Sequence, residues 1–227
     1  LYKNIMKAKY ILTAIAAITA CGLNAQSSQT REISSFTKID ASGAPTISYR
    51  QSDTLSLTVE ANESEFNNIE TKVSDNTLFI KASGTIKGSY KIKITGNTLN
   101  NLSLSGATNF KTIGNLKADS LTIEASGASN INIDCETRSI KTIAAGASQV
   151  NLSGTNKNLY ADVSGASSLK SYKLMNENVD VTASGASTAK IFSSQKLRAN
   201  ATGASSIKFK GEPKEVSAEG SSSSQIV

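Results

Sequence analysis

Apolar and polar residues alternate with a period of two on both sides of a short Gly-centred break, as in SLTIEASGASNINID at 120–134. A period of two is the spacing at which β-strand side chains share one face, so each such unit predicts a strand, a corner and a second strand. A helix is excluded because its period differs and because Ser, Thr and Gly are too dense. The side chains that we expect to face inward are Leu121, Ile123, Ala125, Ile131 and Ile133, with Gly127 at the corner.

This unit recurs along the chain at a nearly constant interval. Its corner glycines are Gly106, Gly127, Gly146, Gly165, Gly185, Gly203 and Gly220, separated by 21, 19, 19, 20, 18 and 17 residues. Antiparallel hairpins would also alternate, but a constant interval of about 19 residues is typical of one coil in a parallel β-helix, whose coils stack about 4.8 Å apart. We therefore predict an all-β fold, a parallel β-helix (β-solenoid) in which each unit forms one coil.

An earlier copy of the unit, at 36–50, is centred on Gly43, and a less regular stretch separates it from the other copies. We predict a single solenoid domain at 33–223, with an irregular β region at 33–98 that caps its start and regular coils at 99–223. The elements predicted inside the irregular region are a strand at 54–61, a short helix at 62–69 with Asn62 as its N-cap, a hairpin at 69–82 that turns at Asp75-Asn76, and a strand at 89–95.

The N-terminus has the order of an export signal, with two lysines before the apolar run YILTAIAAITA and small residues after it. The run is too short to span a membrane comfortably. Two forms of processing fit these residues. Cleavage after Ala25 would remove a signal peptide at 1–25, whereas ITACG resembles a bacterial lipobox, with a signal at 1–20 and a lipidated Cys21. Both predict an exported protein that is periplasmic, on the outer membrane surface or secreted, with a lipid anchor as its only membrane attachment.

Charge and composition limit the chemistry. The chain has no His, 5% aromatic residues and a net charge of +6, of which three charges lie on Lys3, Lys7 and Lys9 in the predicted signal. Nucleic-acid binding, which needs clustered Lys or Arg together with stacking aromatic residues, has little support in the remaining charge distribution. Cys135 is the only cysteine besides Cys21, so we expect no disulfide framework, and a catalytic thiolate would lack its usual His base. We expect no cofactor.

One hydroxyl recurs two residues after each corner glycine, and two interpretations of this row stay open. In a stacked solenoid the row would form a surface ladder that could bind sugar hydroxyls or ordered water. Alternatively, Ser and Thr tolerate a tight corner and hydrogen-bond to the local backbone. The candidate ladder is Thr108, Ser129, Ser148, Ser167, Ser187 and Ser205, and the structural corners are Gly43, Gly106, Gly127, Gly146, Gly165, Gly185 and Gly203.

Carboxylates are the other candidates, because parallel β-helices include polysaccharide lyases and hydrolases, and glycosidases use two carboxyl groups. Asp134 and Glu136 lie close together in the sequence. Coils this short leave few long loops from which a catalytic cleft could be built. The sequence contains no GGxGxD calcium-binding repeat and no Walker, Rossmann or zinc spacing. Further acidic residues, scattered at positions that should face outward, are Asp119, Glu124, Asp162 and Asp180.

The order of these features resembles a known family. An opening F-x-x-I-x-A-S-G at 36–43, an irregular β region and repeated L-x-[IVA]-x-[AV]-S-G-A-S-x-[ILV] units are similar to the "putative auto-transporter adhesin, head GIN domain" family (DUF2807), common in Bacteroidetes. The resemblance covers about residues 33–223 and implies a right-handed β-solenoid outside the cytoplasm. Many relatives have Ser-Gly-Ser-Gly-Asp at the corner. This chain has no acidic residue there, so a cation-binding role at the corners is not carried over.

These features predict a non-enzymatic, exported binding or adhesion module of the cell envelope, without metal or cofactor. Its partner would be an extracellular glycan or protein, and the strand edges at the ends of a solenoid would allow self-association into homo-oligomers. The alternative is a glycan-binding or glycan-active β-helix protein.

Overall fold

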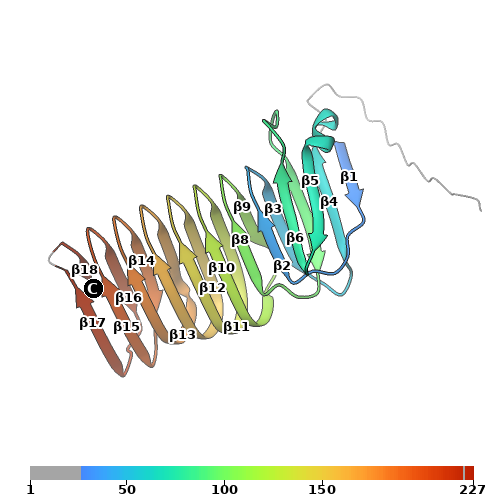
Figure 1. The fold of residues 1–227 in the computed structure, drawn as a ribbon. Helices are drawn as coiled ribbons and strands as arrows, with labels where there is room; N and C mark the ends of the chain where they lie inside the picture. The colour runs from blue at the N-terminus through green and yellow to red at the C-terminus, as the bar shows by residue number, and fades with distance from the viewer. Residues whose placement is uncertain (1–26, 222) are drawn as a thin grey trace, which may run out of the picture.

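The computed structural model describes residues 27–221 and 223–227. Over these residues the chain winds into a solenoid whose eighteen strands form one continuous hydrogen-bonded sheet (Figure 1). Each regular coil has two legs: a leading leg that runs up to the corner glycine and a trailing leg that leaves it. The corners follow one edge of the solenoid and rounded bends follow the opposite edge. The predicted signal segment at 1–25, with Cys21, lies outside the described residues.

The regular coils pair in parallel, and each position pairs with the equivalent position of the next coil. Leu121 pairs with Ile140, and Ile131 pairs with Val150. This register confirms the predicted parallel β-solenoid, and the pairing continues to Ile226, beyond the predicted boundary at 223. The strands of this part are β8 (Asn101–Leu104), β9 (Asn109–Thr112), β10 (Leu116–Ala125), β11 (Asn130–Ala144), β12 (Gln149–Val163), β13 (Ser168–Ala183), β14 (Thr188–Phe192), β15 (Lys196–Ala201), β16 (Ser206–Lys210), β17 (Glu215–Gly220) and β18 (Gln225–Ile226).

One coil contains an extra residue, and the structure shows where it is accommodated. The register between β12 and β13 shifts at the trailing leg, where Asn151 pairs with Lys170 but Ser153 pairs with Lys173. Two residues of β13, Ser171 and Tyr172, therefore oppose a single residue of β12, which is the pattern of a β-bulge. Ser171 is buried and Tyr172 is half-exposed, so the bulge changes which side chains the outer face presents.

The early copy of the repeat, at 36–50, is a genuine coil that lies inside the stack. Its leading leg β2 (Lys38–Ala41) pairs in parallel with both β6 (Thr77–Ala82) and β8, and its trailing leg β3 (Thr46–Gln51) pairs with both β7 (Lys91–Gly96) and β9. The chain thus forms this coil first, builds the next layer on its outer side, and then returns to continue the stack on its inner side.

Antiparallel strands close the N-terminal end. The strands β1 (Ser27–Arg31) and β4 (Ser56–Ala61) pair with each other, β4 pairs with β7, and β5 (Ile69–Ser74) forms the predicted hairpin with β6. The turn residues Asp75 and Asn76 have φ values of 50° and 59°. The predicted helix is a 3₁₀ helix, η1 (Glu63–Asn68). Asn62 occupies its N-cap position, but the side chain donates a hydrogen bond to Lys87 O instead of capping the helix.

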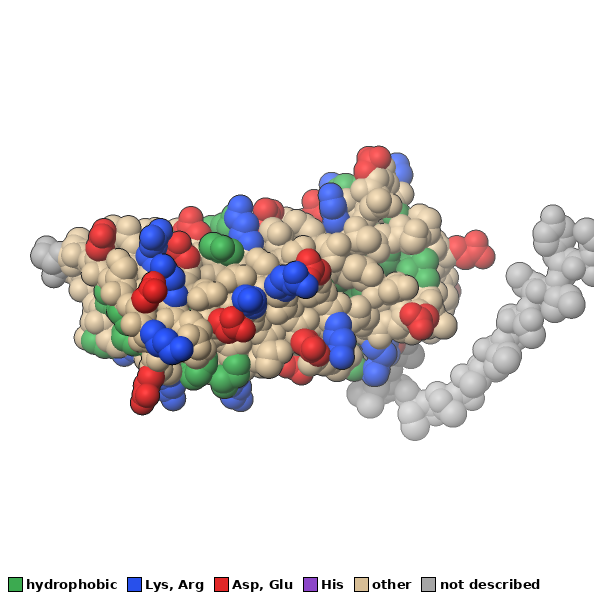
Figure 2. Space-filling view, turned by 90° about the horizontal axis from the view of Figure 1, so that it is seen from below, with side chains coloured by type: hydrophobic (Ala, Val, Ile, Leu, Met, Phe, Trp, Pro, Cys, Tyr) green, Lys and Arg blue, Asp and Glu red, His purple; other side chains and the backbone are tan. Residues whose placement is uncertain are grey.

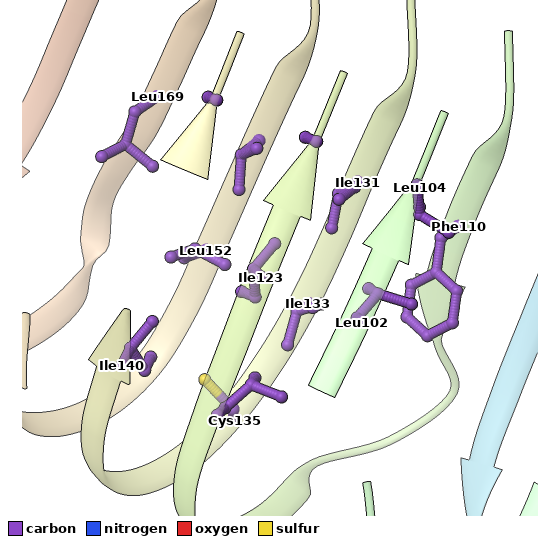
Figure 3. Close-up of a cluster of buried hydrophobic side chains, with 14 of the residues drawn as sticks. Leu102, Leu104, Phe110, Ile123, Ile131, Ile133, Cys135, Ile140, Leu152 and Leu169 are labelled. Atoms are coloured by element: carbon purple, nitrogen blue, oxygen red, sulfur yellow. The ribbon is translucent and has the colours of Figure 1, made fainter. Parts of the chain in front are cut away.

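The core is a continuous apolar strip between the two legs. Figure 3 shows side chains of successive coils, including Leu102, Ile123, Ile131 and Leu152, filling the space between the strands. All five residues that the alternation in 120–134 predicted to face inward are buried. Beside the corner, two residues before the glycine, four of the regular coils have a buried alanine, Ala125, Ala144, Ala183 and Ala201, whereas Leu104 and Val163 fill the same position in two others.

The corner glycines are required for two reasons. At Gly127 the φ value is +67°, a conformation that other L residues rarely adopt. In addition, a Cβ added to Gly127 would lie 2.7 Å from Gly106 O of the preceding coil. That carbonyl accepts a hydrogen bond from Ala128 N at 2.8 Å. The sequence predicted the bend, whereas the close stacking of glycine on glycine emerges from the structure.

These two requirements can be separated by substitution. Gly114 also has a positive φ, +85°, but a Cβ added there would meet no atom within 4 Å. We expect Gly114→Ala to lose about 1–2 kcal/mol of unfolding free energy through backbone strain. Gly127→Ala should lose a further 1–3 kcal/mol or so, because the methyl group overlaps a backbone carbonyl. Urea unfolding monitored by circular dichroism measures both losses, and equal losses would contradict the stacking requirement.

Candidate functional site

The hydroxyl ladder lies inside the solenoid, so the interpretation as a surface row is wrong. All six of its members, from Thr108 to Ser205, are buried. In the corner at 126–129 the first three residues are exposed, and Ser129 is the first side chain to return to the inner face. Four of the serines donate a hydrogen bond to a carbonyl of the preceding coil. These bonds are Ser148 Oγ to Ala125 O at 3.3 Å, Ser167 Oγ to Ala144 O at 2.9 Å, Ser187 Oγ to Val163 O at 2.8 Å, and Ser205 Oγ to Ala183 O at 3.0 Å.

The ladder therefore fastens four of the six corners to the coil before them, which is the backbone interpretation that the sequence left open. The carbonyl of Ala144 accepts the Ser167 hydroxyl and also the Ser164 N–H at 2.8 Å. The single hydroxyl hydrogen of Ser167 is shared with a carbonyl of its own corner, Ser164 O at 2.6 Å. Ser129 differs, because its buried hydroxyl has no hydrogen-bond partner. A row that is buried and bonded to backbone is not available to an external ligand.

Ser167 and Ser129 form a matched pair for a stability measurement. Ser167→Ala removes buried hydrogen bonds, and we expect a loss of about 1 kcal/mol in the free energy of unfolding. Ser129→Ala removes a buried hydroxyl that has no partner, so stability should change by less than about 0.5 kcal/mol or increase. Thermal and urea unfolding of the two variants measure these changes in the free energy of unfolding. Equal destabilisation by both would show that the cross-coil hydrogen bonds do not hold the corner.

Three of the six candidate carboxylates are engaged in ion pairs. Glu136 contacts Lys117 at 3.2 Å, Asp119 contacts Arg138 at 3.1 Å and Asp180 contacts Arg198 at 3.9 Å, each joining neighbouring coils. Figure 2, which views the edge formed by the bends, shows acidic and basic side chains next to one another. Asp134 is different, because its carboxylate accepts a hydrogen bond from Ser153 Oγ at 3.1 Å. Asp134 and Glu136, adjacent in the sequence pattern, thus have separate partners. Glu124 and Asp162 are exposed.

Neither a metal-binding cluster nor a membrane-spanning helix is present among residues 27–221 and 223–227. No three His, Cys, Asp or Glu side chains in this part gather closely enough to hold a metal ion. Within the same residues, no helix has the length and apolar character needed to cross a membrane.

Cys135 is a core residue. It is fully buried beside the bend, and its Sγ lies 3.7 Å from Ser153 O (Figure 3). Burial raises the pKa of its thiol to about 12, because the thiolate would lose its hydration. The thiolate is the nucleophilic form of cysteine, so this residue is unreactive near neutral pH.

We therefore expect iodoacetamide at about pH 8 to leave Cys135 unmodified in the folded protein and to alkylate it in concentrated urea. Peptide mapping by mass spectrometry separates Cys135 from Cys21 and reports on each. Raising the pH increases the thiolate fraction only as it approaches the raised pKa, so the protection should persist through mildly alkaline solution. Rapid alkylation of Cys135 in the folded protein would contradict this assignment.

The structure reveals a candidate binding groove that the sequence reasoning did not identify. It has a volume of about 580 Å³ and lies on the outer face of the trailing legs, over the bulge in β13. Its lining comes from five successive coils, from Thr112 at one end to Lys190 at the other. Four coil intervals of about 4.8 Å make the groove roughly 19 Å long. Polar groups in its lining include Asn132, Asp134 and Asn151.

Lysines dominate the C-terminal part of this face. Lys170 pairs in register with Lys190, and Lys190 pairs in register with Lys208; we call these three residues the lysine row. Lys173 and Lys210 lie beside the row. None of these five lysines forms an ion pair with any carboxylate in the described part of the chain. This is a concentration of unneutralised positive charge on one side of an otherwise balanced molecule.

Tyr172 places an aromatic ring in the groove. It follows the buried Ser171 in the bulge, and its ring lines the groove beside Lys170 and Lys173. Lys210 Nζ lies 4.8 Å from the ring centroid, a cation–π contact from two coils further along. The bulge thus combines a flat aromatic surface with ammonium groups in one shallow depression.

Two signals in the sequence could have pointed to this site. Lysine stands five residues after the corner glycine in three consecutive units, at 170, 190 and 208. Residues at even offsets from the glycine face the core, so these lysines, at an odd offset, face outward. The interval of 20 residues between Gly165 and Gly185 also signals an inserted residue, although it does not say where the insertion falls.

By its fold this protein is a parallel β-solenoid, and the groove lies on the accessible outer face of that fold. The family model described as "putative auto-transporter adhesin, head GIN domain" matches residues 35–213, so the chain belongs to this family. The family is adhesin-like, which indicates an exported or surface protein. A comparison with curated proteins finds no match.

Solved structures agree with this fold. A protein described as a putative adhesin from Bacteroides fragilis has a TM-score of 0.83 and 26% identity, covering 88% of this chain and 94% of its own. A protein from Parabacteroides distasonis, described as a putative lipid binding protein, has a TM-score of 0.71 and 22% identity, with coverage of 88% and 96%. A putative adhesin from Parabacteroides merdae has a TM-score of 0.67 and 18% identity, with coverage of 88% and 95%.

Proposed function

We propose that this protein is a non-enzymatic binding module of the bacterial cell envelope, exported through its N-terminal segment, and that it binds an extracellular ligand in the groove around Tyr172. The family membership supports an adhesive role. The observation that carries the proposal is the groove itself. It is a depression with an aromatic ring, carboxamide groups and unneutralised ammonium groups, on the outer face of a stack of repeated coils.

The shape of the groove supports binding by an extended molecule. Its lining residues come from consecutive coils, so equivalent positions repeat along the axis at about the spacing of parallel strands. Carboxamides such as Asn151, which donates to Asn132 Oδ1 at 3.0 Å, lie at positions paired in register with both neighbouring coils. Side chains held on a paired sheet are positioned before a ligand arrives, which reduces the entropy lost on binding.

Two tyrosines with outward side chains on opposite faces provide the test. Tyr172 lines the groove, whereas Tyr160 is 52% exposed on a leading leg. On an array of extracellular glycans, we expect Tyr172→Ala to reduce binding by about tenfold, because an aromatic contact is worth roughly 1–1.5 kcal/mol. Tyr160→Ala should retain wild-type binding. Loss of binding in both variants, or in Tyr160→Ala alone, would contradict the assignment of the groove as the binding site.

Asp134 favours the second candidate function, a glycan-active solenoid, because a carboxylate in the groove lining could serve as an acid or base. The glycans retained on the array can be incubated with the protein and assayed for new reducing ends. The proposed function predicts binding without product. Product formation that Asp134→Asn abolishes would replace the binding module with an enzyme.

A further inference from the structure

In the lysine row, positively charged side chains lie directly opposite one another on neighbouring strands. Lys170, Lys190 and Lys208 occupy equivalent outward positions on three consecutive coils, about one strand spacing apart. Like charges directly opposite each other on a sheet destabilise it. Lys170 Nζ is held by Gln149 Oε1 at 2.8 Å, which satisfies a hydrogen bond without neutralising any charge. The row therefore has an electrostatic cost that the folded chain alone does not offset.

Elsewhere on the solenoid, several basic side chains pair with an acidic side chain of the adjacent coil. On the leading legs and bends, Lys196 contacts Glu215 at 2.8 Å, Arg198 contacts Asp180 at 3.9 Å and Lys157 contacts Glu177 at 3.9 Å. Each pair joins adjacent coils, so the register readily supplies an acidic partner. The trailing legs of β13, β14 and β16 contain no Asp or Glu at all. The difference between the two faces points to a negative partner from outside the chain.

The other groups in the groove narrow the chemistry of that partner. A flat ring such as Tyr172 packs against the apolar face of a sugar, and amides and carboxylates such as Asn132, Asn151 and Asp134 bond to hydroxyl groups. The groove is long, shallow and formed on a sheet face, so it fits a linear chain. It offers a single aromatic ring, Tyr172, in its lining, whereas single-stranded nucleic acid is held by successive stacked bases.

Resting on the proposed binding function, we propose that the groove binds a linear anionic polysaccharide. Its carboxylate or sulfate groups contact the lysine row, and a sugar ring packs on Tyr172. Alternate lysines of the row, Lys170 and Lys208, are two coils apart, about 9.6 Å. That spacing is comparable with the repeat of a disaccharide, so charged groups on successive disaccharide repeats would meet Lys170 and Lys208.

Isothermal titration calorimetry with polygalacturonate, heparin fragments and neutral dextran tests this proposal on the full chain. We expect the two polyanions to bind with an affinity that falls steeply with salt, and dextran to bind weakly. Lys190→Gln should weaken polyanion binding about threefold to fivefold, as for an exposed ion pair. Replacing all three lysines of the row with Gln should weaken it about 30-fold or more if the contacts are additive. The matched control is Lys141→Gln, an exposed lysine on the opposite face, which should have no effect.

Stability without ligand gives an independent readout. Relief of repulsion in Lys190→Gln should raise the melting temperature at low salt, and the gain should shrink as salt is added. Lys141→Gln should leave the melting temperature unchanged. A variant that gains stability and loses affinity identifies a row retained for binding, and one that loses both would overturn the proposal.

The outcomes distinguish failure of the anionic ligand from failure of the groove as a binding site. If dextran binds as well as the polyanions and only Tyr172→Ala matters, the anionic ligand is overturned while the binding groove stands. If no glycan binds and Tyr172→Ala has no effect, the proposed function fails too. If phosphatidylglycerol vesicles or single-stranded DNA bind through the lysine row and polysaccharides do not, the polysaccharide is overturned in favour of that partner.

Discussion

In-register stacking of parallel coils is the constraint on which the rest of this structure depends. Each coil must superpose on its neighbour at one strand spacing, so a residue type that recurs in the repeat becomes a column. The glycine column shows how strict this is, since the carbonyl of Gly106 occupies the space that a side chain on Gly127 would need. The serine column follows from the same geometry, because four of its hydroxyls, at Ser148, Ser167, Ser187 and Ser205, bond to a carbonyl one coil back.

Columns of identical residues have different energetic consequences on the inner and outer faces of the sheet. Inside, identical neighbours are favourable, because apolar side chains pack, hydroxyls bond to backbone carbonyls one coil back, and carboxamides bond to each other, as Asn156 does to Asn176 at 2.8 Å. Outside, identical charged neighbours repel, and most of the outer surface avoids this by pairing opposite charges between coils. The lysine row is the exception, and it adjoins the groove over the bulge. The coincidence of an aromatic ring, a depression and unneutralised charge is what gives this face its functional interpretation.

Much of the fold could be predicted from the sequence, because the period of two and the glycine interval together specify strand, corner and coil. The same parity fixes the inward residues, and Ile131 and Ile133 at even offsets from Gly127 are buried as expected. Ser129 also has an even offset, so its burial follows from the rule that was applied to its neighbours. The 3₁₀ form of the helix at 63–68 depends on tertiary contacts of the cap, among them the bond from Asn62 to Lys87 O, which local propensity does not contain.

The candidate site was harder to predict, because it depends on where one inserted residue falls. An interval of 20 residues permits a bulge anywhere in the coil, and only the register between Asn151 and Ser153 locates it beside Tyr172. Hydrogen–deuterium exchange of the full chain with and without a bound anionic oligosaccharide tests the account most directly. Slower exchange should appear in the trailing legs at 168–173, 188–192 and 206–210, with no change in the leading leg at 196–201. Protection confined to the leading legs or the corners would contradict the groove and the lysine row as the binding site.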